Sequence, residues 1–258
     1  MAMYDREQIV KGSFGAAYIS EYLLQAQWAE LIELKKVVTE VYTRKGAPLA
    51  VLDIGIGDAR VAKHLSGIEE IWSMVAHWDG IDNAAACVDL SNMVIDTLNL
   101  QDKVSVQQYD AVNLDRWEKQ YDLVMTTWFT AGNFYPAGFP FDTYELEGRK
   151  LDLEHNDTFH KIFSAAWNLL RPQGEIVLGS CYIDRDTNRR RQEAAYRNMG
   201  MTIITGAEDS FTATREGFWS QRFTEEKIKR YCSFTPPERI SFTPLDTYEF
   251  AMQVRLMK

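Results

Sequence analysis

The chain has 258 residues and a formal net charge of −9 at pH 7, and 46% of its residues are hydrophobic. This length and composition allow one large domain with a full core. The acidic balance argues against a nucleic-acid partner, because phosphate backbones carry the same charge. The basic run at 189–191 lies among acidic residues on a predicted helix, and we interpret it as a solvated face.

Cysteine usage and hydropathy indicate an intracellular protein. Cys87, Cys181 and Cys232 are odd in number and widely spaced, which favours free thiols in a reducing compartment and no metal site. No signal peptide opens the chain, and no apolar run approaches the ~18 residues that a membrane-spanning helix needs. We therefore expect a soluble cytoplasmic protein without a membrane partner.

Hydrophobic periodicity predicts alternating helices and strands. The first helix is expected over 19–42, where apolar side chains recur at intervals of three and four residues. Further helices are predicted from 58, over 68–77, 83–98, 157–170 and 187–199, and from Thr224 as N-cap to Tyr231. Strands are predicted at 49–54, 78–82, 104–108, 121–126, 175–182, 202–205, within 210–223 and at 248–256. This alternation indicates a mostly parallel sheet with helices on both faces and an antiparallel C-terminal end.

The segment 51–60 carries the most informative motif of the chain. A short apolar run ends at Asp53, Gly55 and Gly57 follow, and a helical pattern begins directly after them. Glycines in such a turn bring the backbone close to a ligand, and the helix start adds unpaired N–H groups. A dinucleotide-binding turn continues to a third glycine, and Arg60 occupies that position here. The motif therefore favours a cofactor with a cationic, amino-acid-like group over a pyrophosphate.

Together with Asp82 and Asp110, which end the next two predicted strands, this motif resembles that of class I S-adenosylmethionine-dependent methyltransferases. The resemblance covers most of the chain. It implies a Rossmann-like three-layer α/β/α sandwich with a mostly parallel, seven-stranded sheet, and S-adenosylmethionine as the cofactor. It also implies a single methyltransferase domain over 1–258, with 1–46 as a helical cap and 47–258 as the core.

The resemblance assigns a role to each strand-end group. Asp82 would accept hydrogen bonds from both ribose hydroxyls, Asp110 would accept one from the adenine amino group, and Asp53 would hold the methionine part through water. Arg60 would contact the cofactor carboxylate. The alternatives are a helix cap for Asp82, a turn acid for Asp110 and a surface position for Arg60. Cofactor contacts are expected from Asp53, Gly55, Ile56, Gly57, Arg60, Asp82, Asn83, Asp110, Ala111 and Thr127.

A long aromatic segment, 127–144, follows the predicted strand at 121–126. Ligands bind beyond the carboxyl ends of strands in open α/β sheets, and the segment is longer than a simple connection requires. We expect it to line a substrate pocket, and a hydrophobic cluster beneath a loop is the alternative. Substrate contacts are expected from Trp128, Phe129, Asn133, Phe134, Tyr135 and Trp219.

Trp219 lies on a predicted strand that resembles the strand over the active-site mouth in many small-molecule methyltransferases. By alternation, either Ser220 and Arg222 or Trp219 and Gln221 face inward. The segment before Ser20 closes over the cofactor in many such enzymes, and we expect the same here.

The sequence predicts transfer of a methyl group from S-adenosylmethionine to a small molecule, with N-methylation favoured over O-methylation. The cofactor supplies the electrophile, so a base is needed only for a nucleophile that is protonated at neutral pH. His155 and His160 are the candidates for that base, and a surface position is the alternative for both. Three other functions stay open: methylation of a basic peptide, hydride transfer with a nicotinamide cofactor, and cofactor binding in a non-catalytic partner subunit.

Overall fold

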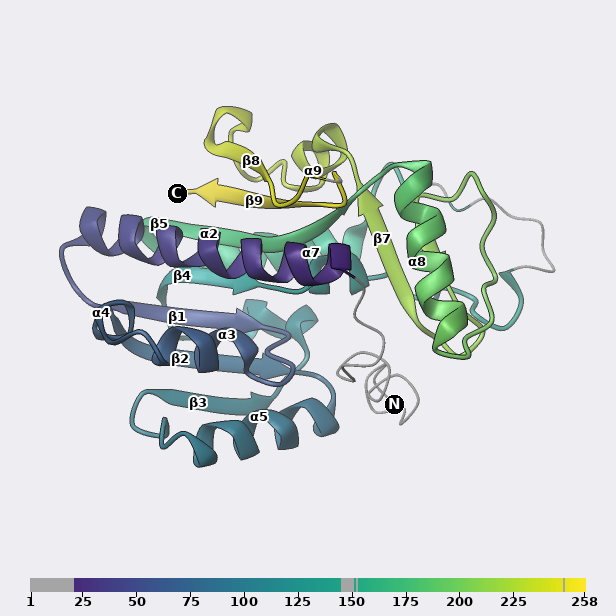
Figure 1. Ribbon diagram of the computed structural model, residues 1–258. Helices are drawn as coiled ribbons and strands as arrows, with labels where there is room; N and C mark the ends of the chain where they lie inside the picture. The colour runs from purple at the N-terminus through teal and green to yellow at the C-terminus, as the bar shows by residue number, and fades with distance from the viewer. Residues whose placement is uncertain (1–20, 145–150, 152, 248) are drawn as a thin grey trace.

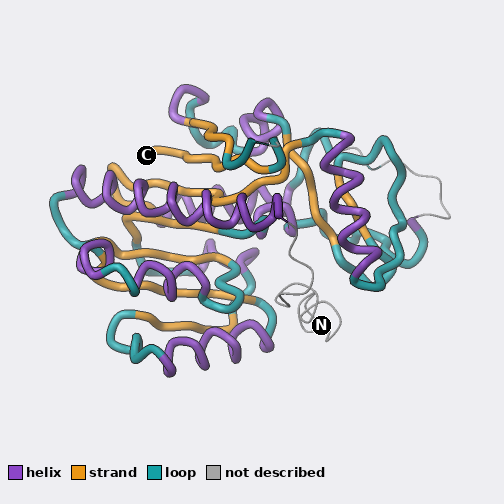
Figure 2. Tube along the Cα trace, in the orientation of Figure 1, coloured by secondary structure: helices purple, strands orange, loops and turns teal. Residues whose placement is uncertain are grey.

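The computed structural model describes residues 21–144, 151, 153–247 and 249–258, which form a sheet with helices on both faces (Figures 1 and 2). The helices are α2 Glu21–Lys45, α3 Arg60–Ser66, α4 Glu69–Ser73, α5 Ala85–Thr97, α7 Asp157–Leu169, α8 Asp186–Asn198 and α9 Glu225–Tyr231, with the 3-10 turns η3 Ala111–Arg116, η4 Thr130–Asn133 and η5 Pro237–Arg239. The strands are β1 Leu49–Ile54, β2 Val75–Asp82, β3 Val104–Gln108, β4 Tyr121–Thr126, β5 Leu170–Ile183, β6 Phe211–Ala213, β7 Trp219–Phe223, β8 Ile240–Pro244 and β9 Ala251–Met257.

The strand order is β3-β2-β1-β4-β5-β7-β6, β9 pairs with β5, and β8 pairs with β9. Strands β1 to β5 are parallel to their neighbours in this order, as are β5 and β7. The pairs β5–β9, β6–β7 and β8–β9 are antiparallel. Strand β1 lies between β2 and β4. Strands β2 and β3 are therefore added on one side of β1 and strands β4 and β5 on the other, and the strand order reverses between β1 and β4. Ligands of open α/β sheets bind beyond the carboxyl ends of the strands at such a point.

The architecture is the predicted α/β sandwich with an antiparallel C-terminal end, but the described part of the sheet has nine strands in place of seven. Strand β8 gave no clear sequence signal, because it is short and only Ile240 within it is buried. The segment 210–223 folds as the hairpin β6–β7. The predicted strand at 202–205 is wrong, since its pairing is limited to one bridge between Ile203 and Thr214.

Two predicted boundaries are also wrong. Residues 75–77 belong to β2 and not to the preceding helix, because they pair with the start of β1 from Leu49 onward. Strand β5 begins at Leu170, ahead of the predicted break at Pro172 and Gly174. A register irregularity against β4 accommodates this interruption.

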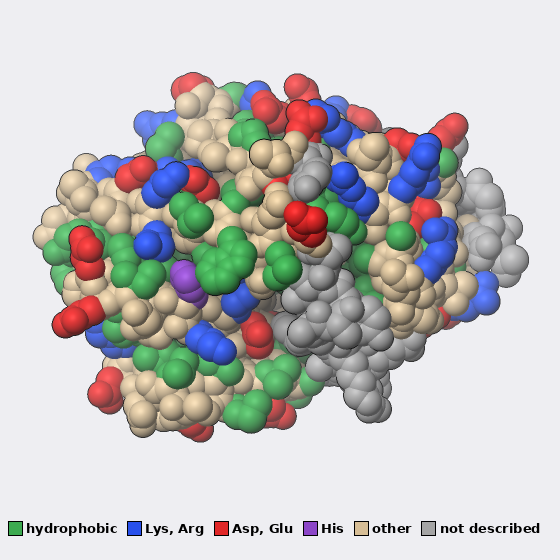
Figure 3. Space-filling model, viewed as in Figure 1, with side chains coloured by type: hydrophobic (Ala, Val, Ile, Leu, Met, Phe, Trp, Pro, Cys, Tyr) green, Lys and Arg blue, Asp and Glu red, His purple; other side chains and the backbone are tan. Residues whose placement is uncertain are grey.

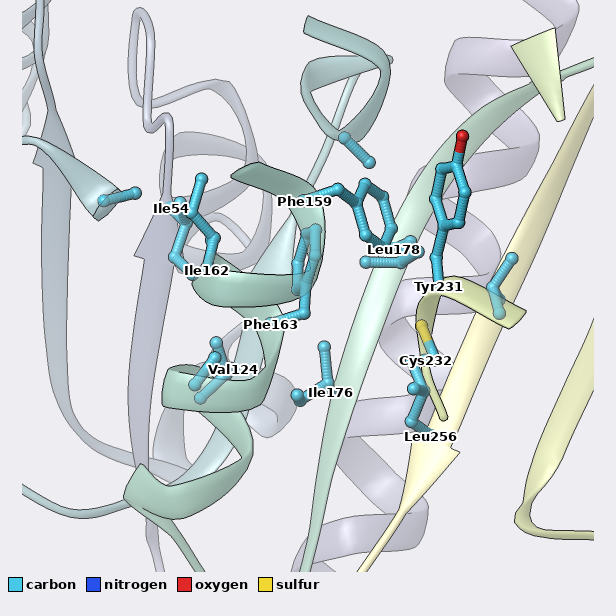
Figure 4. Packing of buried hydrophobic residues seen from close by; sticks show 14 of the residues in the cluster. Ile54, Val124, Phe159, Ile162, Phe163, Ile176, Leu178, Tyr231, Cys232 and Leu256 are labelled. Carbon is cyan, nitrogen blue, oxygen red and sulfur yellow. The ribbon is translucent and has the colours of Figure 1, made fainter. Parts of the chain in front are cut away.

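Two large apolar clusters fix the helices to the two faces of the sheet. On one face, α7 packs Phe159 and Phe163 against the sheet, where Val124 of β4 faces them (Figure 4). On the other face, α2, α3, α4 and α5 pack against a cluster that includes Leu123 and Met125 of the same strand. Each side chain of this size stabilises the fold by about 1.5–3 kcal/mol when fully buried. Successive side chains of β4 therefore point into the two clusters in turn, which shows that the sheet is buried on both faces.

Helix α8 and the β6–β7 hairpin extend past the carboxyl ends of the parallel strands (Figure 1). Helix α2 crosses the front face of the sheet in Figure 1, and its outer face exposes Leu24, Trp28 and Ile32, where hydrophobic side chains are visible among charged ones (Figure 3). Within the described ranges, the length and apolarity needed for a membrane crossing are not combined in any helix. The predicted closure by the segment before Ser20 lies outside the described residues.

Candidate functional site

The turn after β1 is built on two glycines with left-handed backbone. The φ angle is +74° at Gly55 and +62° at Gly57, values that glycine adopts without strain. The N–H groups of Gly55 and Ile56 donate to the carbonyl oxygen of Ile81 in β2, over 2.7 and 3.1 Å. A Cβ atom at Gly55 would lie 2.5 Å from the Thr130 Cγ2 methyl group. The turn is therefore fixed to β2, and Gly55 makes room for the loop after β4.

Asp82 ends β2 with its side chain almost completely buried. Its Oδ1 accepts a hydrogen bond from the Ala84 N–H over 3.0 Å, and its Oδ2 accepts one from the Gly57 N–H over 3.2 Å. Asp82 thus fixes the backbone just before α5 and ties the glycine turn to β2. It is not the helix cap of the alternative prediction, because the N-cap of α5 is Ala84 and no side chain caps that end. A carboxylate oxygen accepts more than one hydrogen bond, so these contacts are compatible with a ligand role.

Asp110 and its neighbours form the outer rim of the same region. The Oδ1 atom of Asp110 accepts a hydrogen bond from the Val112 N–H over 3.1 Å and caps η3. Ala111 is buried beside it. Asn83 is exposed, and its carbonyl oxygen accepts a hydrogen bond from the Gln108 side chain over 3.1 Å. The ends of β2 and β3 therefore meet at one edge, as the sequence predicts.

Asp53 lies behind the cavity wall, because its side chain is 1% exposed and is not among the lining residues. Burial raises the pKa of this carboxyl to about 7; Arg60 opposes the rise, and Glu30 and Asp82 add to it. This buried position gives no support to the predicted contact between Asp53 and the cofactor through water. Arg60 and Asp82, whose charges shift the pKa of Asp53, both line the cavity.

Glu30 of α2 is the centre of a buried polar cluster that the sequence analysis missed. Its Oε1 accepts hydrogen bonds from the Trp128 N–H over 2.8 Å and from the Ser180 hydroxyl over 2.6 Å. Its Oε2 forms an ion pair with Arg60. A Cβ atom at Gly179 would lie 2.6 Å from Glu30 Oε1. This carboxylate therefore joins α2 to β5, to α3 and to the loop after β4.

The sequence did contain a signal for this cluster. Glu30 lies four residues after Ala26 and four before Leu34, so it occupies the buried face of α2. A charged residue at such a position is rarely left without a partner. Searching for that partner would have indicated Arg60, which the glycine motif had already singled out.

Arg60 begins α3 and lines the cavity. Its guanidinium carbon lies 5.3 Å from the centre of the Trp128 ring, a favourable cation–π arrangement. Its Nη1 is buried and has no hydrogen-bond partner among the described residues. A buried donor without a partner is costly to the folded protein.

These groups surround a cavity of about 480 Å³ beyond the carboxyl ends of β1, β2 and β4, a size typical of small-molecule sites. The predicted cofactor residues that line it are Gly55, Ile56, Gly57, Arg60, Asp82, Asn83, Asp110, Ala111 and Thr127. The predicted substrate residues that line it are Trp128, Phe129, Asn133, Phe134 and Tyr135. The structure therefore brings together both predicted sets, apart from Asp53 and Trp219.

Trp219 is fully buried outside the cavity. Its ring stacks on Phe211 with centroids 3.9 Å apart, in an apolar cluster formed with the segment 139–144. Of the two alternatives for this strand, the one with Ser220 and Arg222 facing inward applies, because Ser220 lines the cavity. Arg222, on the same side of the strand, is buried beneath the wall.

The two predicted base candidates lie outside the described cavity lining. His155 and His160 are both exposed. The Nδ1 of His160 donates a hydrogen bond to the Tyr231 carbonyl oxygen over 2.9 Å. Their placement matches the surface alternative.

One part of the cavity wall is missing from the sequence-based prediction. It comes from Tyr182 of β5, Tyr196 and Met199 at the end of α8, and Phe218 before β7. The available signal was a pair of apolar residues, Tyr196 and Met199, three positions apart at the end of a largely polar helix. Further unpredicted lining residues include Leu23, Gln27, Asp58, Cys87, Tyr109, Ala137, Thr158 and Ala195.

Comparisons with known proteins agree with this geometry at the level of the fold. No protein-family model and no curated protein matches the chain, whereas many solved structures do. An S-adenosylmethionine-dependent methyltransferase from Clostridium acetobutylicum ATCC 824 superposes with a TM-score of 0.55 at 12% identity, over 98% of both chains. The chain therefore has the Rossmann-like fold of class I S-adenosylmethionine-dependent methyltransferases.

Two further structures share this fold. Magnesium protoporphyrin IX methyltransferase from Synechocystis PCC 6803, determined with bound S-adenosylmethionine, has a TM-score of 0.55 at 11% identity, over 100% of this chain and 98% of that one. An O-methyltransferase family protein from Burkholderia thailandensis has a TM-score of 0.54 at 11% identity, over 95% of this chain and 63% of that one. Identities this low establish a common fold.

Proposed function

We propose that the protein transfers a methyl group from S-adenosylmethionine to a small molecule. One observation carries this proposal: the glycine turn, Asp82 and Asp110 open onto the same cavity as an aromatic wall. The three solved structures described above are methyltransferases or members of a methyltransferase family, and one of them binds S-adenosylmethionine. The volume of about 480 Å³ suits a small substrate beside a cofactor better than it suits a protein chain.

The residues at the turn fit this cofactor. Asp82 would accept hydrogen bonds from the ribose hydroxyls and Asp110 one from the adenine amino group. The buried Nη1 of Arg60, with no partner among the described residues, fits the carboxylate of the methionine part. When bound, the cofactor supplies an electrophilic methyl group on its sulfonium. The protein's own task is to orient the nucleophile and to exclude water with the Trp128 and Phe129 rings.

The lining also supports N-methylation over O-methylation. Its described residues include no histidine or lysine, and its acids are Asp58, Asp82 and Asp110, all on the cofactor side. An uncharged amine attacks with its own lone pair and releases its proton to water after the transfer. A hydroxyl nucleophile needs a base at the moment of attack, and none of the described lining residues on the aromatic side supplies one.

Ligand-induced stabilisation tests the cofactor assignment. A ligand that binds only the folded protein raises its melting temperature. We expect S-adenosylmethionine and S-adenosylhomocysteine to raise it, and NAD to leave it unchanged. Asp82→Ala should abolish the shift. Asp89→Ala, an exposed acid on α5 outside the cavity lining, is the matched control and should respond as wild type does.

A melting-temperature shift of wild-type size in Asp82→Ala would refute the assignment of Asp82 to the cofactor ribose. A melting-temperature shift with NAD alone would support the nicotinamide alternative. Turnover separates an enzyme from a non-catalytic subunit. With methyl-labelled cofactor, we expect label to enter small uncharged amines. Label entering only a lysine- and arginine-rich peptide would contradict the small-molecule assignment.

A further inference from the structure

The outer face of α2 carries a row of exposed apolar side chains. Leu24, Trp28 and Ile32 are 41%, 58% and 53% exposed. The other exposed large hydrophobic residues of the described ranges are Met93 of α5 and Leu98, its C-cap. All five therefore lie on the face of the sheet that α2 and α5 cover, in front in Figure 1, where Figure 3 shows hydrophobic side chains along α2. Exposed apolar side chains gathered on one face mark an interaction surface.

Helical geometry aligns this row with one charged residue at each end. Successive residues of an α-helix turn by about 100°, so positions 21, 24, 32 and 35 of α2 all point within about 40° of position 28. The residues at these positions are Glu21, Leu24, Trp28, Ile32 and Lys35. We call them the α2 stripe. Neither charged side chain of the stripe forms an ion pair with another residue of the described ranges.

The order of side chains in the α2 stripe is self-complementary. An antiparallel second copy that is paired about a two-fold axis at Trp28 brings the two Trp28 rings together. The same pairing places Leu24 of each copy opposite Ile32 of the other, four residues from the axis along the helix. It also places Glu21 opposite Lys35, seven residues from the axis. A closed two-fold interface uses the same patch on both subunits, and the α2 stripe meets this condition with both its apolar and its charged residues.

Charge favours this occupant over other arrangements. A parallel second copy would place Glu21 against Glu21 and Lys35 against Lys35, and like charges across an interface repel. A membrane surface fits less well, because the chain has a net charge of −9 and anionic lipids repel it. The antiparallel copy gives both charges of the stripe a partner of opposite sign.

We propose that the protein forms a two-fold symmetric homodimer in which the α2 stripes of two copies pack antiparallel about Trp28. The Trp28 ring packs edge-on to His64 of α3 with centroids 5.9 Å apart, and buried tryptophans are typical anchors at interface centres. The stripe is small beside the ~800 Å² per partner of a stable interface. We therefore expect a weak dimer with a dissociation constant on the order of 10 µM. The stripe lies outside the described cavity lining, so the proposal does not rest on the proposed function.

Sedimentation velocity of the full chain between about 1 and 200 µM tests the association. The wild type should be largely monomeric at the low end and dimeric at the high end. Trp28→Glu places two carboxylates at the axis and should remain monomeric throughout. Met93→Glu is the matched control, because Met93 is 59% exposed on the same face of the sheet but lies outside the stripe. It should leave the dissociation constant unchanged.

Exchanging the charges at the ends of the stripe tests the antiparallel register. Glu21→Lys and Lys35→Glu should each raise the dissociation constant about tenfold, because two-fold symmetry repeats the new like-charge contact. The double variant restores opposite charges at both contacts and should return close to the wild-type value. Thermal unfolding at about 1 µM verifies that each variant is folded, since substitutions at exposed positions change stability little.

Four results would overturn the proposal. A wild-type chain that stays monomeric at about 200 µM would assign the stripe to an occupant other than a second copy. A dimer that persists in Trp28→Glu, or one that Met93→Glu weakens equally, would place the interface elsewhere. Additive weakening in the double charge variant would exclude the antiparallel register. The binding of S-adenosylhomocysteine is measured separately, so failure of the proposed function leaves these outcomes unchanged.

Discussion

Asp53 is a fully buried carboxyl whose pKa of about 7 lies far above its ordinary value of 3.8. Burial is the main cause, because Arg60 only partly offsets the loss of hydration. Between pH 4 and pH 7 the folded protein therefore binds more protons at this site than the unfolded chain does. The free energy of unfolding accordingly falls as the pH rises through that window.

The first prediction concerns Asp53→Asn, which removes this titration. The variant's free energy of unfolding, relative to that of the wild type, should increase by about 2 kcal/mol between pH 5 and pH 8. Urea unfolding at the two pH values measures the difference. Asp89→Asn, at an exposed position on α5, should show no such change. A difference that is constant with pH would mean that Asp53 is ionised throughout.

At the residue scale, sequence analysis could locate groups whose type a motif dictates. Gly55, Gly57 and Asp82 were found because a turn and a strand end limit what can stand there. Glu30 and Tyr196 were not found, because their roles depend on which element faces them. That information is absent from local spacing and appears only when α2 and α8 are packed against the sheet.

At the scale of elements, the glycine turn and the loop after β4 depend on each other. Gly55→Ala should destabilise the protein by about 2 kcal/mol or more, because alanine resists a φ of +74° and its Cβ would collide with the Thr130 methyl group. It should also weaken the melting-temperature shift with S-adenosylhomocysteine. Both effects are measured in one thermal-unfolding series.

Thr130→Ser provides the control for this contact, since it removes the Cγ2 methyl group. Combined with Gly55→Ala, it should restore part of the lost stability and leave the part due to backbone strain. Simple additivity of the two changes would show that the close approach of these residues has no energetic weight.

Whether an element could be predicted depends on whether its signal is local or comes from a partner distant in the sequence. Thr224 was identified as an N-cap, and its Oγ1 accepts a hydrogen bond from the Lys227 N–H over 3.2 Å. Such a signal is local. The start of β5 and the existence of β8 depend on pairing with β4 and β9, so a break at Pro172 or a half-exposed strand could not be interpreted from periodicity alone.

At the scale of the whole molecule, the Glu30 carboxylate connects four parts of the chain. Glu30→Gln keeps an oxygen for Trp128 and Ser180 but leaves Arg60 without its counter-ion. We expect a loss of about 3 kcal/mol in the free energy of unfolding. Glu33→Gln, which breaks only the exposed pair with Lys36, should cost about 0.5 kcal/mol or less. Equal losses in the two variants would refute the importance of the buried cluster.

The two sides of the cavity come from separate stretches of the chain. Most of the lining around the glycine turn lies between Ile54 and Val112, whereas Tyr196, Phe218 and the wall beside them lie between Tyr182 and Ser220. Substitutions in α8 and β7 would therefore reshape one wall of the cavity while the glycine turn and the acids beside it stay unchanged.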